Sequence, residues 1–370
     1  MTRLISRAPL ARRLSVVAAV AAAALAACSR TASVTSGGAT PFRSTTVDSA
    51  YVLSLLSTLA HDSMAGRMTG SPGSARAARF IGEQMQRIGL SSAGDSGFFQ
   101  RVPMYQVQRT MGGQTRTVPA LASSFAALDT IPAARRLTGV NVVGIMRGSD
   151  PALAGEAILV DAHYDHLGTG PAVEGDSVFN GADDDASGTV AVLEIARVLA
   201  AGPRPRRTIV FAATTGEEVG LLGTRWYIQH PPHPLDQTVA NLEIEMIGRP
   251  DSLAGGRGKG WLTGYERSTM GEALAAAGIP LVPDKRPEQN FFMRSDNIAF
   301  ARLGIPAHTL SSYNLHTDYH KRSDDASHAD AGHMAQVIDA AARAVRLLAD
   351  GPRPTWKPGG QPGPAQPRRP

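Results

Sequence analysis

Cysteine is almost absent from this sequence, and aromatic residues are scarce. The 370-residue chain holds one cysteine, Cys28, which excludes an internal disulfide and a cysteine-based zinc site. Aromatic residues make up 5% of the chain, so a core must be filled mainly by Ala, Val, Leu and Ile. Hydrophobic residues at 43% and charged residues at 19% are ordinary for a globular protein, and they exclude a wholly disordered chain.

The N-terminal segment has an apolar run, residues 14–27, that is too short to cross a bilayer as a helix, which takes about 20 residues. Four arginines precede it, and it ends in Leu-Ala-Ala-Cys28. This pattern resembles a bacterial lipoprotein signal, although an ordinary secretory signal with Cys28 as a bystander is the alternative. We expect residues 1–27 to be a signal peptide, Cys28 to be lipidated, and residues 28–47 to form a flexible tether. These features predict a lipid-anchored protein of the cell envelope, at the outer membrane or its periplasmic face.

Positive charge is concentrated at the two ends of the chain. Residues 1–27 and residues 351–370 each carry four basic residues and no acid, so the net charge of +5 is not a property of the body. The sequence therefore gives no argument for nucleic-acid binding. Residues 351–370 are rich in Pro and Gly, which predicts a disordered tail. The body is residues 48–350.

Strand and helix patterns alternate along the body. Apolar periodicity predicts helices at residues 74–88, 187–200 and 334–348, with Ser187 as a candidate N-cap. Short apolar runs predict strands at residues 140–145, 157–160, 208–213, 242–246 and 305–310. This order predicts an α/β domain with helices on both faces of a largely parallel sheet.

Polar clusters follow several of the predicted strands, where the sites of open α/β sheets form. His163 and Asp165 follow the second strand, and a carboxylate can orient a zinc-binding histidine through its other ring nitrogen. Three adjacent acids, 183–185, come next, and they are open to two other interpretations: a solvated turn or a calcium loop ending at Glu194. We discount calcium because residues 168–182 have no helical period and Glu194 lies inside a predicted helix.

Further acids and histidines complete the set. Glu217 and Glu218 follow the strand at 208–213, where one carboxylate could bind a metal while the other serves as a base. Glu245 shares a strand face with Glu243, and His320 lies in a histidine-containing segment after the last strand. Such a mixture of imidazole and carboxylate suits a pair of divalent ions, and it suits zinc better than calcium or magnesium.

Six ordered sequence blocks resemble the motifs of the M28 zinc metallopeptidases. The resemblance covers roughly residues 50–348, and its blocks are AHYDH, GADDDASG, FAATTGEEVGLLG, LEIEMIGRP, FFMRSDNIAF and DYHKRSDD. It implies a single catalytic domain, a three-layer α/β/α sandwich around a mixed, mostly parallel sheet, with two zinc ions and peptide substrates. Most members of the family are aminopeptidases, and carboxypeptidases and glutaminyl cyclases are the alternatives on the same fold. A metal-binding receptor without activity is a further alternative. The presence of Glu217, which matches the family's general base, argues against it.

The resemblance also implies a role for each motif residue. It makes Glu217 the general base and Asp165 the carboxylate that orients a histidine ligand. Asp184 is implied as the carboxylate shared by both metals. The remaining implied metal ligands are His163, Glu218, Glu245 and His320. Glu245 is a departure, because the family usually has Asp there, but the longer side chain offers the same oxygens.

Overall fold

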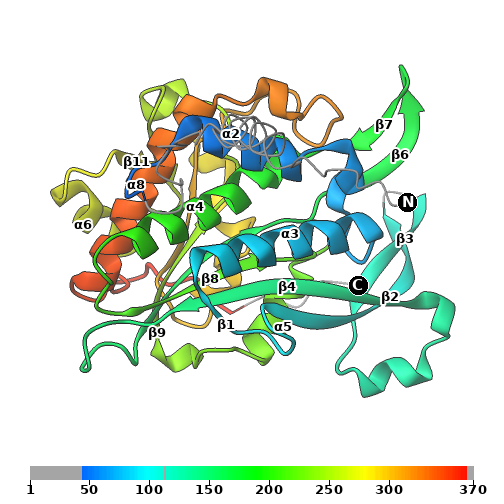
Figure 1. Cartoon of the computed structure of the whole chain (residues 1–370), viewed down its shortest axis with the longest axis horizontal. Coiled ribbons are helices and arrows are strands. Elements are labelled where there is room, and N and C mark those ends of the chain that lie inside the picture. The colour runs from blue at the N-terminus through cyan, green and yellow to red at the C-terminus, as the bar shows by residue number, and fades with distance from the viewer. Residues whose placement is uncertain (1–43, 112–113, 365–370) are drawn as a thin grey trace, which may run out of the picture. The chain divides into compact units, whose positions relative to one another are not determined.

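The computed structural model describes residues 44–111 and 114–364, which belong to one compact unit. Its helices are α2 (Ser49–Leu59), α3 (Pro72–Ile88), α4 (Gly188–Ala201), α5 (Leu222–Gln229), α6 (Met270–Ala276), α7 (Asn297–Ala301) and α8 (Ala331–Asp350). The main sheet contains β1 (Ser91–Ser92), β2 (Phe99–Met111), β3 (Gln114–Leu121), β4 (Arg136–Met146), β5 (Ala157–His163), β8 (Thr208–Thr214), β9 (Thr238–Ile244), β10 (Gly260–Leu262), β11 (Leu281–Pro283) and β12 (Ala307–Ser311). A separate hairpin, β6 (Gly168–Val173) and β7 (Asp176–Phe179), stands apart from it (Figure 1).

The main sheet is mixed, and its strand order is β11-β10-β12-β9-β5-β8-β4-β2-β3, with β1 on β4. The four central strands β12, β9, β5 and β8 run parallel to one another. Strands β4, β2 and β3 extend the sheet by antiparallel pairing. The α/β fold and the mixed sheet are confirmed, but parallel pairing is limited to the centre and to the β10–β11 pair, less than the alternation of elements indicates.

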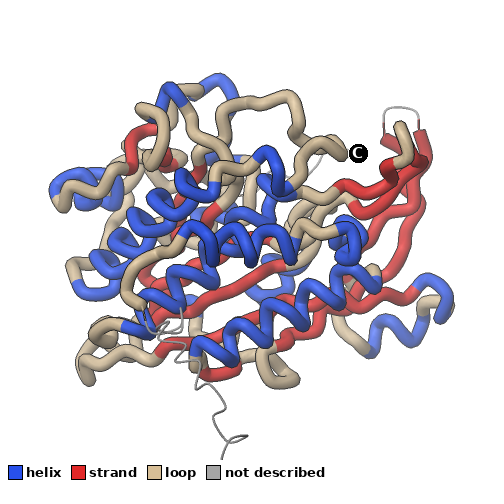
Figure 2. The backbone as a smooth tube through the Cα atoms, turned by 45° about the horizontal axis from the view of Figure 1, so that its top comes forward, coloured by secondary structure: helices blue, strands red, loops and turns tan. Residues whose placement is uncertain are grey.

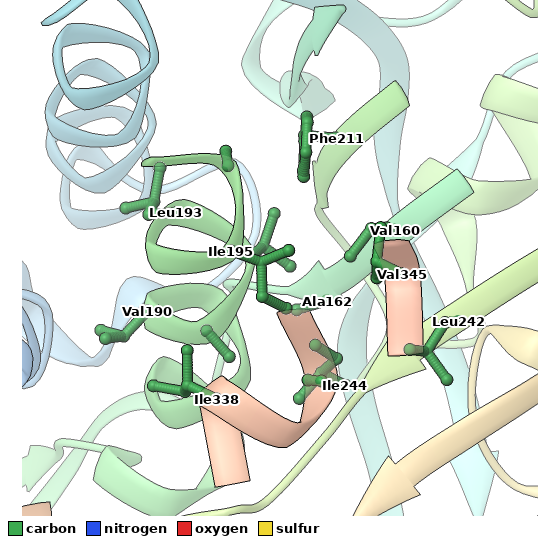
Figure 3. Close-up of a cluster of buried hydrophobic side chains, with 14 of the residues drawn as sticks. Val160, Ala162, Val190, Leu193, Ile195, Phe211, Leu242, Ile244, Ile338 and Val345 are labelled. Carbon is green, nitrogen blue, oxygen red and sulfur yellow. The ribbon is translucent and has the colours of Figure 1, made fainter. Parts of the chain in front are cut away.

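Helices cover both faces of the sheet (Figures 1 and 2). Because β5 is central, its side chains alternate between two cores. Ile158, Val160 and Ala162 pack under α4 and α8, where Figure 3 shows Val190, Ile338 and other helix residues meeting the strands. Ala157 and Leu159 face the opposite core, which contains residues of α5 and α7. This double burial explains why the central strands read as continuous apolar runs.

The predicted helices are present, and local signals explain their ends. The Ser71 side chain accepts a hydrogen bond from the backbone N–H of Ser74 at the start of α3. Gly89 ends α3 in the left-handed conformation, at φ 88°. The N-cap prediction for Ser187 is wrong: its hydroxyl donates to the carbonyl of Asp183, and the carboxylate of Asp185 accepts from the first N–H of α4 instead.

Both predicted boundaries of the body need correction. Before residue 48, the carbonyls of Ser44 and Thr46 accept hydrogen bonds from Arg197, so the ordered domain begins inside the predicted tether. The prediction of a disordered tail is wrong for residues 351–364. Trp356 bridges to Ser268 and donates its indole N–H to a backbone carbonyl, and these anchors fix a stretch of chain that has few apolar residues.

The predicted signal peptide and lipidation site, residues 1–28, lie outside the described residues, as do residues 365–370. Among the helices that the structure describes, none combines the length and apolar character needed to cross a membrane.

Candidate metal centre

The predicted site residues meet at the carboxyl ends of the four parallel strands. His163 is the last residue of β5, Glu217 and Glu218 follow β8, and Glu245 follows β9. His320 lies in the segment after β12. Parallel strands end at the same edge of the sheet, so segments that are far apart in sequence converge there.

Asp184 stands at the centre of this cluster, and its two oxygens face different neighbours. Its Oδ1 lies 3.4 Å from His163 Nε2, while its Oδ2 lies 3.1 Å from His320 Nε2. The ligand atoms of His163, Asp184 and Glu245 lie within 4.8 Å of one another and form one candidate metal group. On the other side, Glu218 Oε2 lies 3.2 Å from His320 Nε2. This arrangement is what a carboxylate shared between two cations requires.

The three adjacent acids have different tasks. The carboxylate of Asp183 accepts from the N–H of Gly248 and contacts His316 Nε2 at 2.9 Å. That of Asp185 accepts from the N–H groups of Gly188 and Met246. Of the three, Asp184 alone belongs to the candidate metal groups. Like charges can stand side by side here because the turn at Ala182–Ser187 sends each one to its own partners.

Asp165 orients His163 in a way that differs from the expectation. The ring nitrogen Nδ1 of His163 lies 3.2 Å from the backbone carbonyl of Asp165 and 3.8 Å from its carboxylate. Because a carbonyl only accepts, Nδ1 is the nitrogen that donates to it, and Nε2 is left to face Asp184 or a bound cation. The Asp165 carboxylate instead accepts from the Thr69 hydroxyl and from the backbone N–H of Glu217. It therefore positions the candidate base as well as the histidine.

Burial and neighbouring charges perturb the acids strongly. Burial is the largest cause that raises the pKa of Glu217 well above its ordinary value, and the Glu245 carboxylate adds to it. Burial and the charge of Glu243 raise the pKa of Glu245 to about 8. For Asp184, burial acts in the same direction, but the imidazoles of His163 and His320 outweigh it and hold its pKa well below the usual range. Imidazolium charges thus compensate the carboxylates, and a divalent cation would take over that role.

Three residues that sequence reasoning did not assign also build the site. His166 is 1% exposed and joins Asp184 and Glu218 in a second candidate metal group. The carboxylate of Asp324 accepts from the backbone N–H groups of residues 183 and 184. The Arg67 side chain, also buried, donates to backbone carbonyls on both sides of the cluster. The doubled histidine in AHYDH was a visible signal for His166, and Asp324 lies in the block DYHKRSDD, but the sequence does not indicate which distant backbone groups Asp324 and Arg67 bind.

The other predicted candidates fall outside the cluster. Glu243 lies in β9, two residues before Glu245, and is fully buried; it accepts from Ser295, Thr309 and two backbone N–H groups. Glu194 lies in α4 and pairs with Arg197 at 2.7 Å, which removes it from any calcium loop. His320 Nε2 faces Asp184 and Glu218, whereas the nearby His316 faces Asp183 and is not part of the cluster.

A small pocket adjoins the cluster at Glu245. Its walls are largely aromatic, with Trp261 stacked on Phe291 and Tyr313 at the edge of the same ring. Arg294, exposed at the pocket, lies over the Phe291 ring at 5.1 Å. The pocket can therefore receive a side chain while the bond next to it lies at the cluster.

The donor set fits zinc. Several buried ligand atoms have no hydrogen-bond partner among the described residues, namely Nε2 of His163, Oε1 of Glu218 and Nε2 of His320. Buried polar atoms are nearly always satisfied, so a converging set of orphaned ones needs a missing partner. Imidazole nitrogen with carboxylate oxygen is a donor set that zinc accepts and that calcium and magnesium disfavour.

A family model, described as Peptidase family M28, matches residues 141–345. The match covers more than half of the chain and includes every strand that carries a cluster residue. The chain belongs to peptidase family M28.

Individual relatives are more distant. The vacuolar membrane protease of Aspergillus clavatus is 30% identical over 203 residues, which are 54% of this chain and 19% of that protein. The chain thus spans about a fifth of the length of the curated relatives it matches. A zinc aminopeptidase of Bacillus subtilis has a TM-score of 0.59 at 17% identity, over 84% of this chain and 97% of that one. A glutaminyl cyclase of Porphyromonas gingivalis has a TM-score of 0.55 at 14% identity, over 80% and 97%. These likenesses show the fold, which serves more than one reaction.

Proposed function

We propose that this M28 chain is a dinuclear zinc aminopeptidase that removes N-terminal residues from peptides. The observation that carries the proposal is the division of Asp184 between two groups of ligand atoms. One ion would be held by His163, Asp184 and Glu245, and the other by Asp184, Glu218 and His320. Zinc bound there supplies Lewis-acid polarisation of a carbonyl and lowers the pKa of a water molecule.

Glu217 is the group placed to move the proton. Its Oε2 lies 4.0 Å from His163 Nε2, and its backbone N–H is fixed on the Asp165 carboxylate. Because burial raises its pKa, the carboxylate can take a proton from the attacking water and then give it to the departing nitrogen. Glu217 would thus act first as the general base and then as the general acid.

The pocket beside Glu245 supports a terminal exopeptidase. A substrate side chain in the aromatic pocket places the adjoining α-amino group at the edge of the cluster. Apolar N-terminal residues are therefore the preferred substrates. Arg294 favours a second candidate, a carboxypeptidase, because a guanidinium at the same pocket could bind a terminal carboxylate.

The location of the protein is part of the proposal. The sequence pattern that ends at Cys28 supports export and lipid anchoring in the cell envelope. Two or more acyl chains would hold the domain at a membrane surface without any spanning helix.

The test is hydrolysis of aminoacyl-p-nitroanilides by the chain from Ser29 onward, loaded with zinc. We expect release from Leu and Phe derivatives that needs a free α-amino group. Glu217→Gln should lower kcat by about 10²–10⁴-fold, the usual contribution of a general base, while the zinc content stays the same. Glu83→Gln is the matched control, because Glu83 is exposed on α3, and it should leave kcat unchanged.

The outcomes separate the candidates. A Glu217→Gln enzyme within tenfold of the wild-type kcat would refute the role of Glu217. Hydrolysis of N-blocked dipeptides instead of aminoacyl anilides would establish the carboxypeptidase. Ammonia release from peptides with N-terminal glutamine would establish a cyclase.

A further inference from the structure

His166 is a buried histidine whose ring nitrogens have no hydrogen-bond partner among the described residues. It follows β5 by three residues, so the same strand end that delivers His163 delivers it as well. An imidazole of this kind loses its hydrogen bonds to water without gaining others, which is costly in a protein interior. A cation bound in the cluster would satisfy the ring nitrogen that faces it.

The surroundings of His166 Nδ1 identify that partner. It lies 2.8 Å from Glu218 Oε1 and 3.9 Å from Asp184 Oδ2. The close pair has an ion-pair distance, yet neither atom has a hydrogen bond of acceptable geometry. In a tetrahedral zinc site with bonds of about 2.0–2.1 Å, neighbouring ligand atoms lie about 3.3 Å apart. The separations of 2.8 and 3.9 Å lie on either side of this value, as expected for donor atoms that surround one cation.

His320 completes the same constellation. Its Nε2 lies 3.1 Å from Asp184 Oδ2 and 3.2 Å from Glu218 Oε2. The rings of His166 and His320 meet edge to face, with centroids 5.7 Å apart. Two imidazoles thus approach the same pair of carboxylates from different sides.

The backbone holds the His166 ring in this place. Gly181 has a φ of 56°, and a Cβ on it would lie 2.5 Å from the imidazole ring. The glycine therefore lets the ring pack directly against the turn that carries Asp184. Ring and bridging carboxylate are fixed relative to each other before any ion binds.

We propose that His166 is a ligand of the second metal ion through Nδ1. This inference rests on the proposed dinuclear centre and adds a ligand to it. The second ion would then have four protein ligands, namely His166, Asp184, Glu218 and His320. The first would have three, which leaves it the more open position for substrate. The two ions should consequently differ in affinity, the second being held more tightly.

X-ray absorption at the zinc edge tests the assignment in the unaltered full-length protein loaded with two zinc ions. Three imidazoles per zinc pair are expected, from residues 163, 166 and 320. Two imidazoles per pair would overturn the role of His166 and leave the proposed peptidase intact. A protein that takes up no stoichiometric zinc would overturn the dinuclear centre, and this assignment with it.

A metal-affinity measurement gives a second readout, independent of activity. We expect His166→Ala to raise the dissociation constant of the tighter zinc, measured by chelator competition, by at least about 1,000-fold. Loss of a partner that only orients a ligand costs about 10–100-fold, so a change in or below that range would overturn the ligand assignment. His316→Gln is the matched control, because His316 is also largely buried but faces Asp183, and it should keep both affinities within tenfold. If His166→Ala does not fold, the absorption measurement decides.

Discussion

Arg67 is a buried side chain whose removal should weaken both the fold and the candidate site. Its guanidinium donates to four backbone carbonyls: those of Tyr164 at 2.6 Å, Leu59 at 2.9 Å, Asn180 at 2.5 Å and Gly181 at 2.8 Å. The side chain is 0% exposed. Two of these carbonyls immediately precede the segment of the bridging carboxylate, and a third lies in the segment of the histidine ligands. One side chain therefore connects the two halves of the metal centre.

The expected size of the effect follows from those contacts. In Arg67→Met, four carbonyls lose a charged donor, and each such hydrogen bond contributes about 1.5–3 kcal/mol net. The sum is an overestimate, because burial of the guanidinium itself is costly and lowers its pKa. We therefore expect a loss of about 4 kcal/mol in unfolding free energy, within the range for breaking a buried charged network. With an m-value of about 3 kcal/mol/M in urea, the midpoint should fall by about 1.3 M.

The assay is urea unfolding followed by circular dichroism, with zinc content measured in parallel. Arg67→Lys is the informative companion, because it keeps the charge but loses the planar fork that reaches four acceptors. It should recover less than half of the loss. A midpoint for Arg67→Met within about 0.3 M of the wild type would refute the reasoning, since the carbonyls would then have found other donors.

Two further predictions concern the ends of the chain. Hydrogen bonds from Arg353 and Arg207 lower the pKa of Glu156 to about 2 despite its partial burial, so its stabilising effect is complete above its ordinary value of 4.5 and is lost as the pH falls toward 2. Glu156→Gln should thus lower the unfolding free energy by about 1–2 kcal/mol at pH 7, a figure reduced for the exposure of Arg353. The difference between variant and wild type should shrink between pH 5 and pH 3, and an equal difference at pH 7 and pH 3 would contradict this. Cys28→Ala should move the protein from the membrane fraction to the soluble fraction of a cell that makes lipoproteins, and continued membrane attachment would exclude Cys28 as the anchor.

Sequence patterns predicted the central strands and their helices well. Strands that are buried on both faces of the sheet consist of short, continuous runs of apolar residues, which are easy to recognise. They also predicted which segments converge, since adjacent parallel strands end at one edge. The antiparallel strands β2 and β3 were less visible, because residues 102–137 lack clear alternation. The ordered tail was missed for a different reason: composition averages over residues, whereas a single anchor such as Trp356 fixes its neighbours.

The candidate site was also predictable from the sequence only in part. Residue types and their order indicated metal chemistry, and the family resemblance selected Asp184 from three adjacent acids. The backbone turn that separates the partners of Asp183 and Asp185 has no local sequence signature of its own. Long-range hydrogen bonds have no local signature either, so the partners of Asp324 and Arg67 became visible only in the folded structure, although Asp324 lies in the block DYHKRSDD. His166 was within the motif, directly after the orienting acid Asp165, but that spacing alone assigns it no ligand role.

The β6–β7 hairpin lies in sequence between His166 and Asp184, yet it forms a sheet of its own. Arg67 donates hydrogen bonds to the carbonyl of Tyr164, before this hairpin, and to that of Gly181, after it. These two hydrogen bonds hold the ends of the hairpin segment together. Its lower part is not independent of the site, because Arg322, two residues after His320, donates to the carbonyl of Pro171 and lies over the Phe179 ring. Only the exposed tip at residues 174 and 175 lies beyond these contacts, so insertions should be tolerated there without moving the ligand side chains.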